Sequence, residues 1–198
     1  GLVARPADGE AMVRIHNTNT GKIIVSRFPV EQGALAASGD LAIDGVEGQA
    51  APIRLEFLQP GGAKTGKLLW AFHGIPRRGD AANPTVFVLA KALGKTGNET
   101  PQELEADPQF LARMARVREA GAAAMGIPGS ASVPLVAMVS QGGEGADIQV
   151  RMISMGQPHR ATPITGAICL ALACRIPGSL PHRLCAAQEG PIRIAHPS

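Results

Sequence analysis

Polar and hydrophobic residues alternate along three short stretches of the chain: Met12–His16, Ile53–Phe57 and Ile148–Met152. Alternation turns successive side chains to opposite faces of a strand, so each stretch predicts a strand with one buried face. The pattern therefore indicates strands in both the first and the last third of the chain.

Two further stretches are apolar without clear alternation. Lys22–Ser26 and Thr85–Leu89 are rich in Val, Ile and Phe, which predicts strands that are more fully buried. Turns are predicted at Asn19-Thr20-Gly21 and at Asp44-Gly45, because Gly and Asn tolerate positive φ.

A first helix is predicted to begin at Asp107-Pro108, where Asp caps the helix and Pro occupies its first position. Apolar and small residues then recur at three- and four-residue steps along one face: Phe110, Met114, Val117, Gly121 and Met125. Gly126 followed by Pro128 ends the helix.

A second helix is predicted from near Thr165 to just before Pro177-Gly178. The apolar run Ile168–Ala173 leaves it no polar face, which is typical of an enclosed helix. Strands and helices that are mixed without regular alternation predict an α+β fold. The first amides of a helix are unsatisfied, so Thr165-Gly166-Ala167 is a candidate site for a carboxylate.

The segment Leu68–Asp80 shows neither a helical nor a strand period. Trp70, His73 and Pro76 crowd it together with a run of Arg and Gly. We therefore expect a crossover here between two domains, at residues 1–70 and 80–198.

Composition excludes several classes of function. The chain has 198 residues, a net charge of +3, and 3% aromatic residues with no Tyr. Sparse aromatic residues and dispersed positive charge disfavour nucleic-acid binding. No apolar run is long enough to cross a membrane. Three cysteines without a CxxC pair, and histidines without ligand spacing, predict no metal site and buried thiols in a reducing cytoplasm.

Three local motifs each leave two interpretations. Gly61–Lys67 (GGAKTGK) resembles a phosphate-binding loop but lacks the following hydroxyl, and a Gly-rich turn is favoured. Asn83 precedes Pro84 and is either turn chemistry or an amide that recognises a carboxylate. His159 lies six residues before Thr165 and either contributes to the anion site or has no role.

Several longer motifs resemble the PrpF-like family of methylaconitate isomerases and 4-oxalomesaconate tautomerases. They are Asn17–Lys22 (NTNTGK), Asp40–Gly48 (DLAIDGVEG), Ala51–Lys67, Asp80–Val88 (DAANPTVFV), Met152–Ala161 (MISMGQPHRA) and Thr165–Gly178. The resemblance implies a diaminopimelate epimerase-like fold, in which each lobe is a β-barrel-like sheet around a central helix. It also implies that this chain is an internal fragment, with the second lobe complete and the first partial.

The resemblance further implies cofactor-independent proton transfer alpha to a carboxylate, with a small tricarboxylate as substrate. The family's catalytic cysteine and lysine have no counterpart here, and Pro163 stands where epimerase relatives carry a cysteine. No catalytic residue is therefore assigned. The implied substrate-binding residues are Asn83, Ser154, Met155, Gly156, His159, Thr165, Gly166 and Ala167.

Two functions follow from these expectations. The first is a cytoplasmic isomerase of unsaturated tricarboxylates that is inactive as this fragment. The second is a non-catalytic anion-binding or interaction module that retains only the fold. No membrane or nucleic-acid partner is expected, and whether the chain forms a homodimer stays open.

Overall fold

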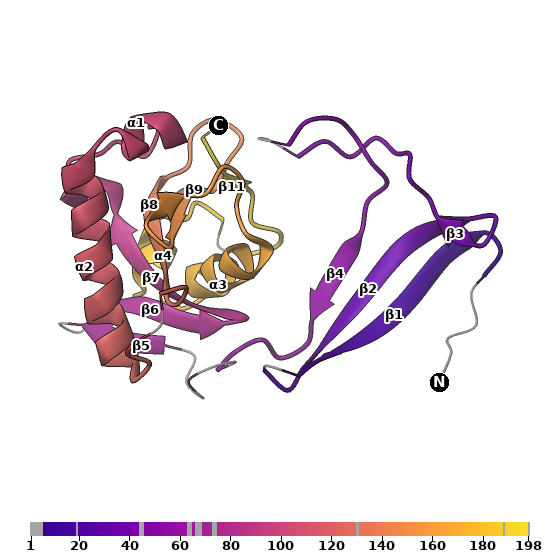
Figure 1. The fold of residues 1–198 in the computed structure, drawn as a ribbon, viewed down its shortest axis with the longest axis horizontal. Helices are drawn as coiled ribbons and strands as arrows, with labels where there is room; N and C mark the ends of the chain where they lie inside the picture. Colours follow the sequence, from indigo (N-terminus) through magenta and orange to yellow (C-terminus); the bar gives the residue numbers. More distant parts are fainter. Residues whose placement is uncertain are drawn as a thin grey trace. The chain divides into compact units, whose positions relative to one another are not determined.

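The computed structural model describes residues 6–18, 20–43, 46–62, 65, 69–72, 75–129, 131–187 and 189–197. The chain divides into two compact units, Gly1–Pro60 and Gly61–Ser198 (Figure 1). Each unit contains one sheet, and the second unit also contains the helices, so the fold is α+β as predicted.

The first unit is a small antiparallel sheet. Its strands are β1 (Gly9–Asn17), β2 (Lys22–Glu31), β3 (Ala34–Leu35) and β4 (Arg54–Phe57). β2 pairs with all three of the others. The turn predicted between β1 and β2 is present, because the amide of Gly21 donates to the carbonyl of Asn17 at 2.8 Å and Gly21 has a φ of 65°. Asn19 and the predicted Asp44-Gly45 turn lie outside the described residues.

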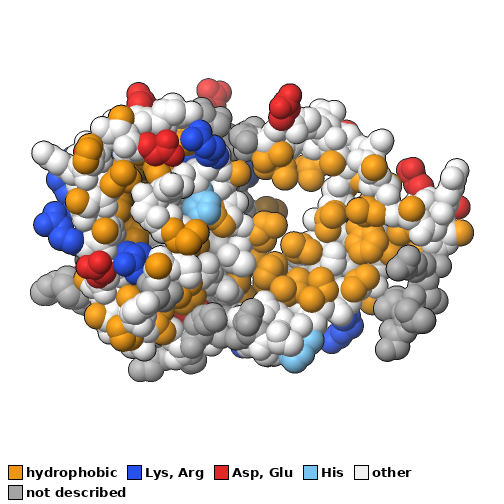
Figure 2. Space-filling view, in the orientation of Figure 1, with side chains coloured by type: hydrophobic (Ala, Val, Ile, Leu, Met, Phe, Trp, Pro, Cys, Tyr) orange, Lys and Arg blue, Asp and Glu red, His pale blue; other side chains and the backbone are white. Residues whose placement is uncertain are grey.

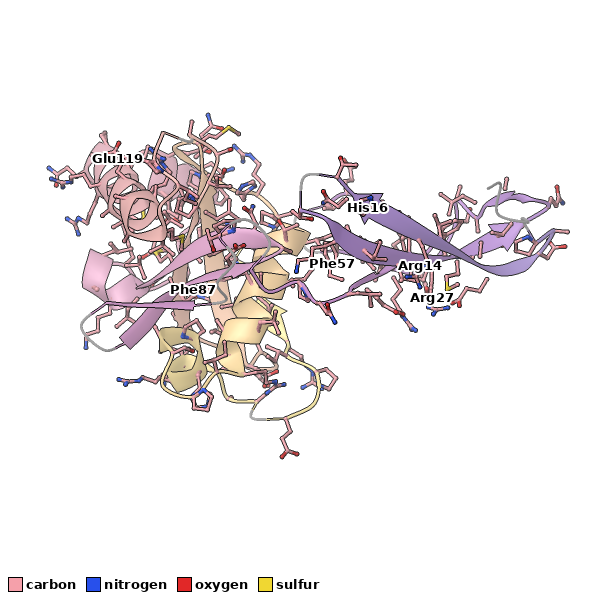
Figure 3. All side chains as sticks on the ribbon, turned by 90° about the horizontal axis from the view of Figure 1, so that it is seen from below. Arg14, His16, Arg27, Phe57, Phe87 and Glu119 are labelled. Carbon is pink, nitrogen blue, oxygen red and sulfur yellow. The ribbon has the colours of Figure 1, made fainter. Side chains whose placement is uncertain are left out.

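The two faces of this sheet differ in polarity. Ile15 pairs with Ile24, and Ile24 pairs with Phe57, so these three apolar side chains lie on one face of the sheet. Apart from Ser26 and the strand-end residues Gly9, Asn17 and Lys22, that face comprises Ala11, Val13, Ile15, Ile24, Phe28, Val30, Leu35, Leu55 and Phe57. The opposite face carries charged side chains, among them Arg14 and Arg27 (Figure 3), together with the apolar Ile23 and Val25. Arg27 pairs with Glu56 at 3.0 Å. Hydrophobic side chains gather on the surface of this unit (Figure 2).

The second unit is built on a mixed sheet with the strand order β10-β9-β8-β7-β6-β5, in which β11 also pairs with β9. The strands are β5 (Leu69–Phe72), β6 (Ile75–Ala81), β7 (Asn83–Leu89), β8 (Leu135–Gln141), β9 (Ile148–Ser154), β10 (Gln157–Pro158) and β11 (Ile194–Ala195). β7 and β8 are parallel, and β9 runs antiparallel to β8.

The expectation of a crossover at Leu68–Asp80 was wrong. Residues 69–72 and 75–81 form β5 and β6, which pair with each other at one edge of the second sheet. The register shifts between Trp70 and Ala71, and this irregularity interrupts the two-residue period that would have revealed a strand. His73 lies outside the described residues, as does most of the Gly61–Lys67 motif. The expected division at 1–70 and 80–198 stays a prediction about the lobes.

The parallel strands β7 and β8 are joined through helices. These are the 3₁₀ helix η1 (Ala90–Leu93), α1 (Pro101–Glu105) and α2 (Pro108–Met125). The prediction for α2 is confirmed at both ends. The side chain of Asp107 accepts the amide of Phe110 at 2.9 Å, and Gly126 ends the helix with a φ of 70°.

Two hydrophobic cores lie on opposite faces of the second sheet. Alternate residues of β8 separate them, since Val136 and Met138 pack with α2 while Ala137 and Val139 pack with α3 (Ile164–Cys174) and α4 (Leu180–Leu184) (Figure 1). A strand that is buried on both faces needs no polar alternation, which explains the continuous apolar sequence of β8.

The helix α3 begins at Ile164, one residue earlier than predicted. Its buried residues are Gly166, Cys169, Leu170, Ala173 and Cys174. The other residues are half-buried except Ile164, which is 56% exposed. The helix is therefore mostly covered, with its first residue at the surface. In the described part of the chain, no helix has the length and apolarity needed to cross a bilayer.

Candidate functional site

The sequence-predicted residues gather at one end of the second sheet. Asn83 is the first residue of β7, and Ser154 is the last residue of β9. Because β7 is parallel to β8 and β9 is antiparallel to it, these two positions share an end of the sheet. The start of α3 lies at the same end, since Gly166 packs against Leu135 of β8 and Met152 of β9. The fold thus brings Asn83, Ser154 and the start of α3 to a common edge.

The first turn of α3 has no side-chain cap. Pro163 precedes the helix, and the amide of Ala167 donates to its carbonyl at 2.9 Å. The amides of Ile164, Thr165 and Gly166 therefore come before the first intrahelical bond and point out of the helix end. By contrast, α1, α2 and α4 are each capped by a side chain: Thr100, Asp107 and Ser179.

This geometry changes which amides of the expected site are free to donate. Ala167 is not available as a donor, because its amide is engaged inside the helix, while the amide of Ile164 replaces it. The first turn of α3 also holds no acidic residue, so no carboxylate there offsets the positive end of the helix dipole. Three adjacent backbone donors and an uncompensated dipole favour a carboxylate ligand.

Met155 and Gly156 form the tip of the hairpin between β9 and β10. Both have positive φ, 49° and 80°, and the side chain of Met155 is 70% exposed. They line a cavity of about 260 Å³ together with Met114 and Arg118 of α2. This cavity opens on the α2 face of the sheet, whereas α3 packs on the other face. Their contact with a substrate stays a prediction.

His159 lies one residue beyond β10 and is half-buried. Its amide donates to the carbonyl of Met152 at 2.8 Å, and its carbonyl accepts from the guanidinium of Arg151 at 2.8 Å. Burial lowers the pKa of His159 below its ordinary value. The imidazole is therefore neutral near pH 7.

Sequence reasoning missed the carboxylate of Asp80, which is fully buried just before Asn83. One of its oxygens, Oδ2, accepts the amide and the hydroxyl of Thr65 at 2.7 and 2.9 Å. Ala82, which lies in the turn between Asp80 and Asn83, has a φ of 64°. Asp80 thus fastens the Gly-rich segment to the turn that presents Asn83. The sequence DAANP does show an Asp at a turn, but an Asp in a turn is ordinarily exposed. Its burial was therefore not predicted.

The thiol nearest the start of α3 along the helix is that of Cys169. It is buried, and burial raises its pKa to about 11, while the side chain of Thr85 hydrogen-bonds it. A thiol with such a pKa is protonated near pH 7 and cannot act as a nucleophile or base. Within the described ranges, no three His, Cys, Asp or Glu side chains are grouped closely enough to hold a metal ion.

The comparisons agree with the motifs. A sequence model of the PrpF protein family matches residues 1–198. The Escherichia coli (strain K12) protein YbhH is 37% identical over 196 residues, which cover 94% of this chain and 56% of YbhH. The 2-methyl-aconitate isomerase of Shewanella oneidensis is 33% identical over an alignment of 228 positions including gaps. The alignment covers 98% of this chain and 57% of that protein.

A solved structure shares the fold. The crystal structure of methylitaconate-delta-isomerase matches with a TM-score of 0.81 and 28% identity, covering 100% of this chain and 59% of that one. The chain therefore spans a little over half the length of the relatives that it matches. These matches confirm the resemblance that the sequence motifs indicated.

Proposed function

The chain belongs to the PrpF protein family, and from this premise we propose that it forms part of an isomerase of unsaturated tricarboxylates. The reaction would be a cis–trans isomerisation or tautomerisation of the methylaconitate or oxalomesaconate type. It would proceed by cofactor-independent removal of a proton alpha to a carboxylate and its return elsewhere on the substrate. The proposal includes a diaminopimelate epimerase-like arrangement, with a complete second lobe around α3 and a partial first lobe.

The uncapped start of α3 carries this proposal. Removal of an alpha proton leaves an enediolate, whose negative charge must be stabilised by fixed donors. The amides of Ile164, Thr165 and Gly166 are such donors, because the helix holds them in place before any ligand binds. A substrate carboxylate would bind there, with the hydroxyl of Thr165 as an additional donor.

Asn83 would contribute a second contact from the same end of the sheet. Its side chain is half-buried at the start of β7, and the buried Asp80 holds the preceding segment in place. An amide can donate to a carboxylate without adding charge, which suits a substrate with several carboxylates. His159, Ser154, Met155 and Gly156 stay predicted contacts of this substrate.

The alternative is a non-catalytic module that binds an anion and retains only the fold. Cys169 favours it, because the pKa of this thiol near α3 is raised to about 11 by burial. A proton-transfer group needs a pKa closer to the working pH. A homodimer and a cytoplasmic location stay predictions under either function.

Binding can be tested without catalysis. We expect trans-aconitate, added to the ¹⁵N-labelled chain, to shift the backbone amide signals of Ile164, Thr165 and Gly166 more than those of α2. Its neutral trimethyl ester is the matched control and should leave these signals unchanged. If the acid moves no signal at the start of α3, the proposed carboxylate site is wrong.

A further inference from the structure

Arg151 is fully buried on β9, and no carboxylate of the described residues lies within ion-pair distance of it. Its guanidinium donates instead to the carbonyl of His159 at 2.8 Å and to that of Glu99 at 3.2 Å. It also contacts Nε2 of His196 at 2.9 Å and donates to the carbonyl of Pro197. A buried charge is costly unless it is well hydrogen-bonded, so these acceptors are what keep Arg151 in place.

The acceptors belong to three separate segments. Glu99 precedes α1, His159 follows β10, and His196 and Pro197 follow β11. One guanidinium therefore fastens three loops to the centre of β9. The same nitrogen, Nη1, contacts both the carbonyl of His159 and the ring of His196. His196 and the carbonyl of His159 are therefore linked through a single atom.

The contact fixes the protonation of His196. Arginine has only donors, so Nε2 of His196 must accept and the ring proton must lie on Nδ1. Nδ1 is buried, and no hydrogen-bond partner for it occurs among the described residues. Protonation at Nε2 would place a second N–H against Nη1 at 2.9 Å and remove the acceptor. The contact between Arg151 and His196 therefore exists only while His196 is neutral.

The groups around His196 reinforce this preference. Arg151 faces it from β9 and His159 from the loop after β10, while the carboxylate of Glu99 accepts the amides of Thr96 and Gly97. Burial, and then the charge of Arg151, hold the pKa of His196 below its ordinary value, although hydrogen bonding to the backbone of His159 and of His196 itself acts in the opposite direction. Lowering the pH through the ordinary histidine range therefore acts against the folded arrangement.

The loop that Arg151 holds leads directly into the candidate site. His159 is followed by Arg160, which pairs with Glu105 of α1 at 3.6 Å, and the chain reaches α3 at Ile164. The position of the uncapped amides thus depends on how residues 159–163 are fastened. At its start, the loop is also held to β9, because the amide of His159 donates to the carbonyl of Met152.

We propose that Arg151 is a positioning residue for the start of α3, acting through the carbonyl of His159, and that protonation of His196 weakens this hold. The inference deepens the proposed function, because it adds acid sensitivity to the same carboxylate site. Arg151 itself touches no substrate in this account.

Two variants of His196 separate protonation from packing. In His196→Gln, the side-chain oxygen can take the place of Nε2 and accept from Arg151 at any pH. In His196→Ala, the acceptor is lost at any pH. The measurement is the set of backbone amide shifts of residues 160–166 in the ¹⁵N-labelled chain, followed from about pH 8 to about pH 5, the range in which histidines titrate. The ring signal of His196 is followed in the same samples.

In the wild type, we expect these amides to shift with the midpoint at which the His196 ring titrates. In His196→Gln, the transition with this midpoint should disappear, and the only change left should follow the ring signal of His159, whose pKa burial also lowers. In His196→Ala, the chemical shifts of these amides should lie near the values that the wild type shows at acid pH, at every pH measured. An unchanged transition in His196→Gln, or no transition in the wild type, overturns the inference. No ligand is present, so the result does not depend on whether tricarboxylates bind.

Discussion

The amide of Ala167 donates to the carbonyl of Pro163 at 2.9 Å. This bond closes the first turn of α3 and leaves the amides of Ile164, Thr165 and Gly166 before it. Because Pro163 has no hydroxyl, amide or carboxylate in its side chain, it cannot cap them. The donors that define the candidate site thus follow from one residue at the start of one helix.

The Cα of Gly166 faces the core, although its backbone amide is one of the proposed donors. A Cβ at this position would lie 3.0 Å from Cε of Met152 and 3.2 Å from Cδ1 of Leu135. Gly166→Val should therefore lower the free energy of unfolding by about 1–3 kcal/mol, the usual cost of overpacking. Urea unfolding measures this, with Ile164→Val at the exposed helix start as control. If the two variants unfold with equal free energies, the core around Gly166 accommodates the added side chain, and the predicted overpacking is wrong.

The hydroxyl of Thr65 is expected to stabilise the buried Asp80. Thr65→Val removes the donor at 2.9 Å from Oδ2 with little change of shape. A buried charge that loses a hydrogen bond should lower the free energy of unfolding by about 1–3 kcal/mol. Thr65→Ser keeps the hydroxyl and should cost less. The account of Asp80 fails if Val and Ser variants unfold at the same urea concentration.

Stability should fall as the pH is lowered through the histidine range. The pKa values of His159 and His196 are both lowered in the folded chain, mainly by burial. Below the ordinary value of about 6.5, the unfolded chain binds more protons, so stability is full above that pH and is lost below it. Each histidine adds a slope of at most about 1.4 kcal/mol per pH unit.

His196→Gln should remove its share of this slope and leave that of His159. Urea unfolding of the wild type and the variant, each at about pH 7.5 and about pH 5.5, measures the difference. A variant with the full wild-type loss of stability would exclude His196 as a source of the pH dependence.

The purified chain alone should not isomerise methylaconitate or oxalomesaconate above background. The pKa of Cys169, raised to about 11, leaves no thiolate near α3, and loss of a proton-transfer group typically costs on the order of 10²–10⁴ in rate. A spectrophotometric assay beside a full-length relative checks this. Turnover near that of ordinary enzymes, about 10 per second, would contradict the proposal that this part is inactive alone.

Much of the fold was predictable because local signals agreed with it. The Asp107-Pro108 start and Gly126 end of α2 are chain-local, and so is the alternation in β1 and β4. β8 was not predicted, although its apolar run is of the same kind as that of β7, which was. β5 and β6 were missed because a register shift at Trp70 interrupts the period.

The site was less predictable, since it depends on contacts between distant segments. The in–out pattern of Ile148–Met152 suggests that Arg151 faces solvent, yet it is fully buried. Its acceptors include His196, which is 45 residues away in the sequence. The start of α3 was predicted to within one residue, because Pro, Thr and Gly at a helix start are local signals. The carboxylate site at that start stays a proposal.

The most direct test of the central claim compares two substitutions of Ile164. Ile164→Pro removes one of the exposed amides, and proline is tolerated at the first position of a helix. Ile164→Ala keeps the amide and shortens the side chain by a comparable amount. Calorimetric titration with trans-aconitate should show binding to the Ala variant that is close to wild type. The Pro variant should lose about 1.5–3 kcal/mol, roughly a tenfold to hundredfold weakening. Equal affinities for the two variants would contradict a carboxylate site at the start of α3.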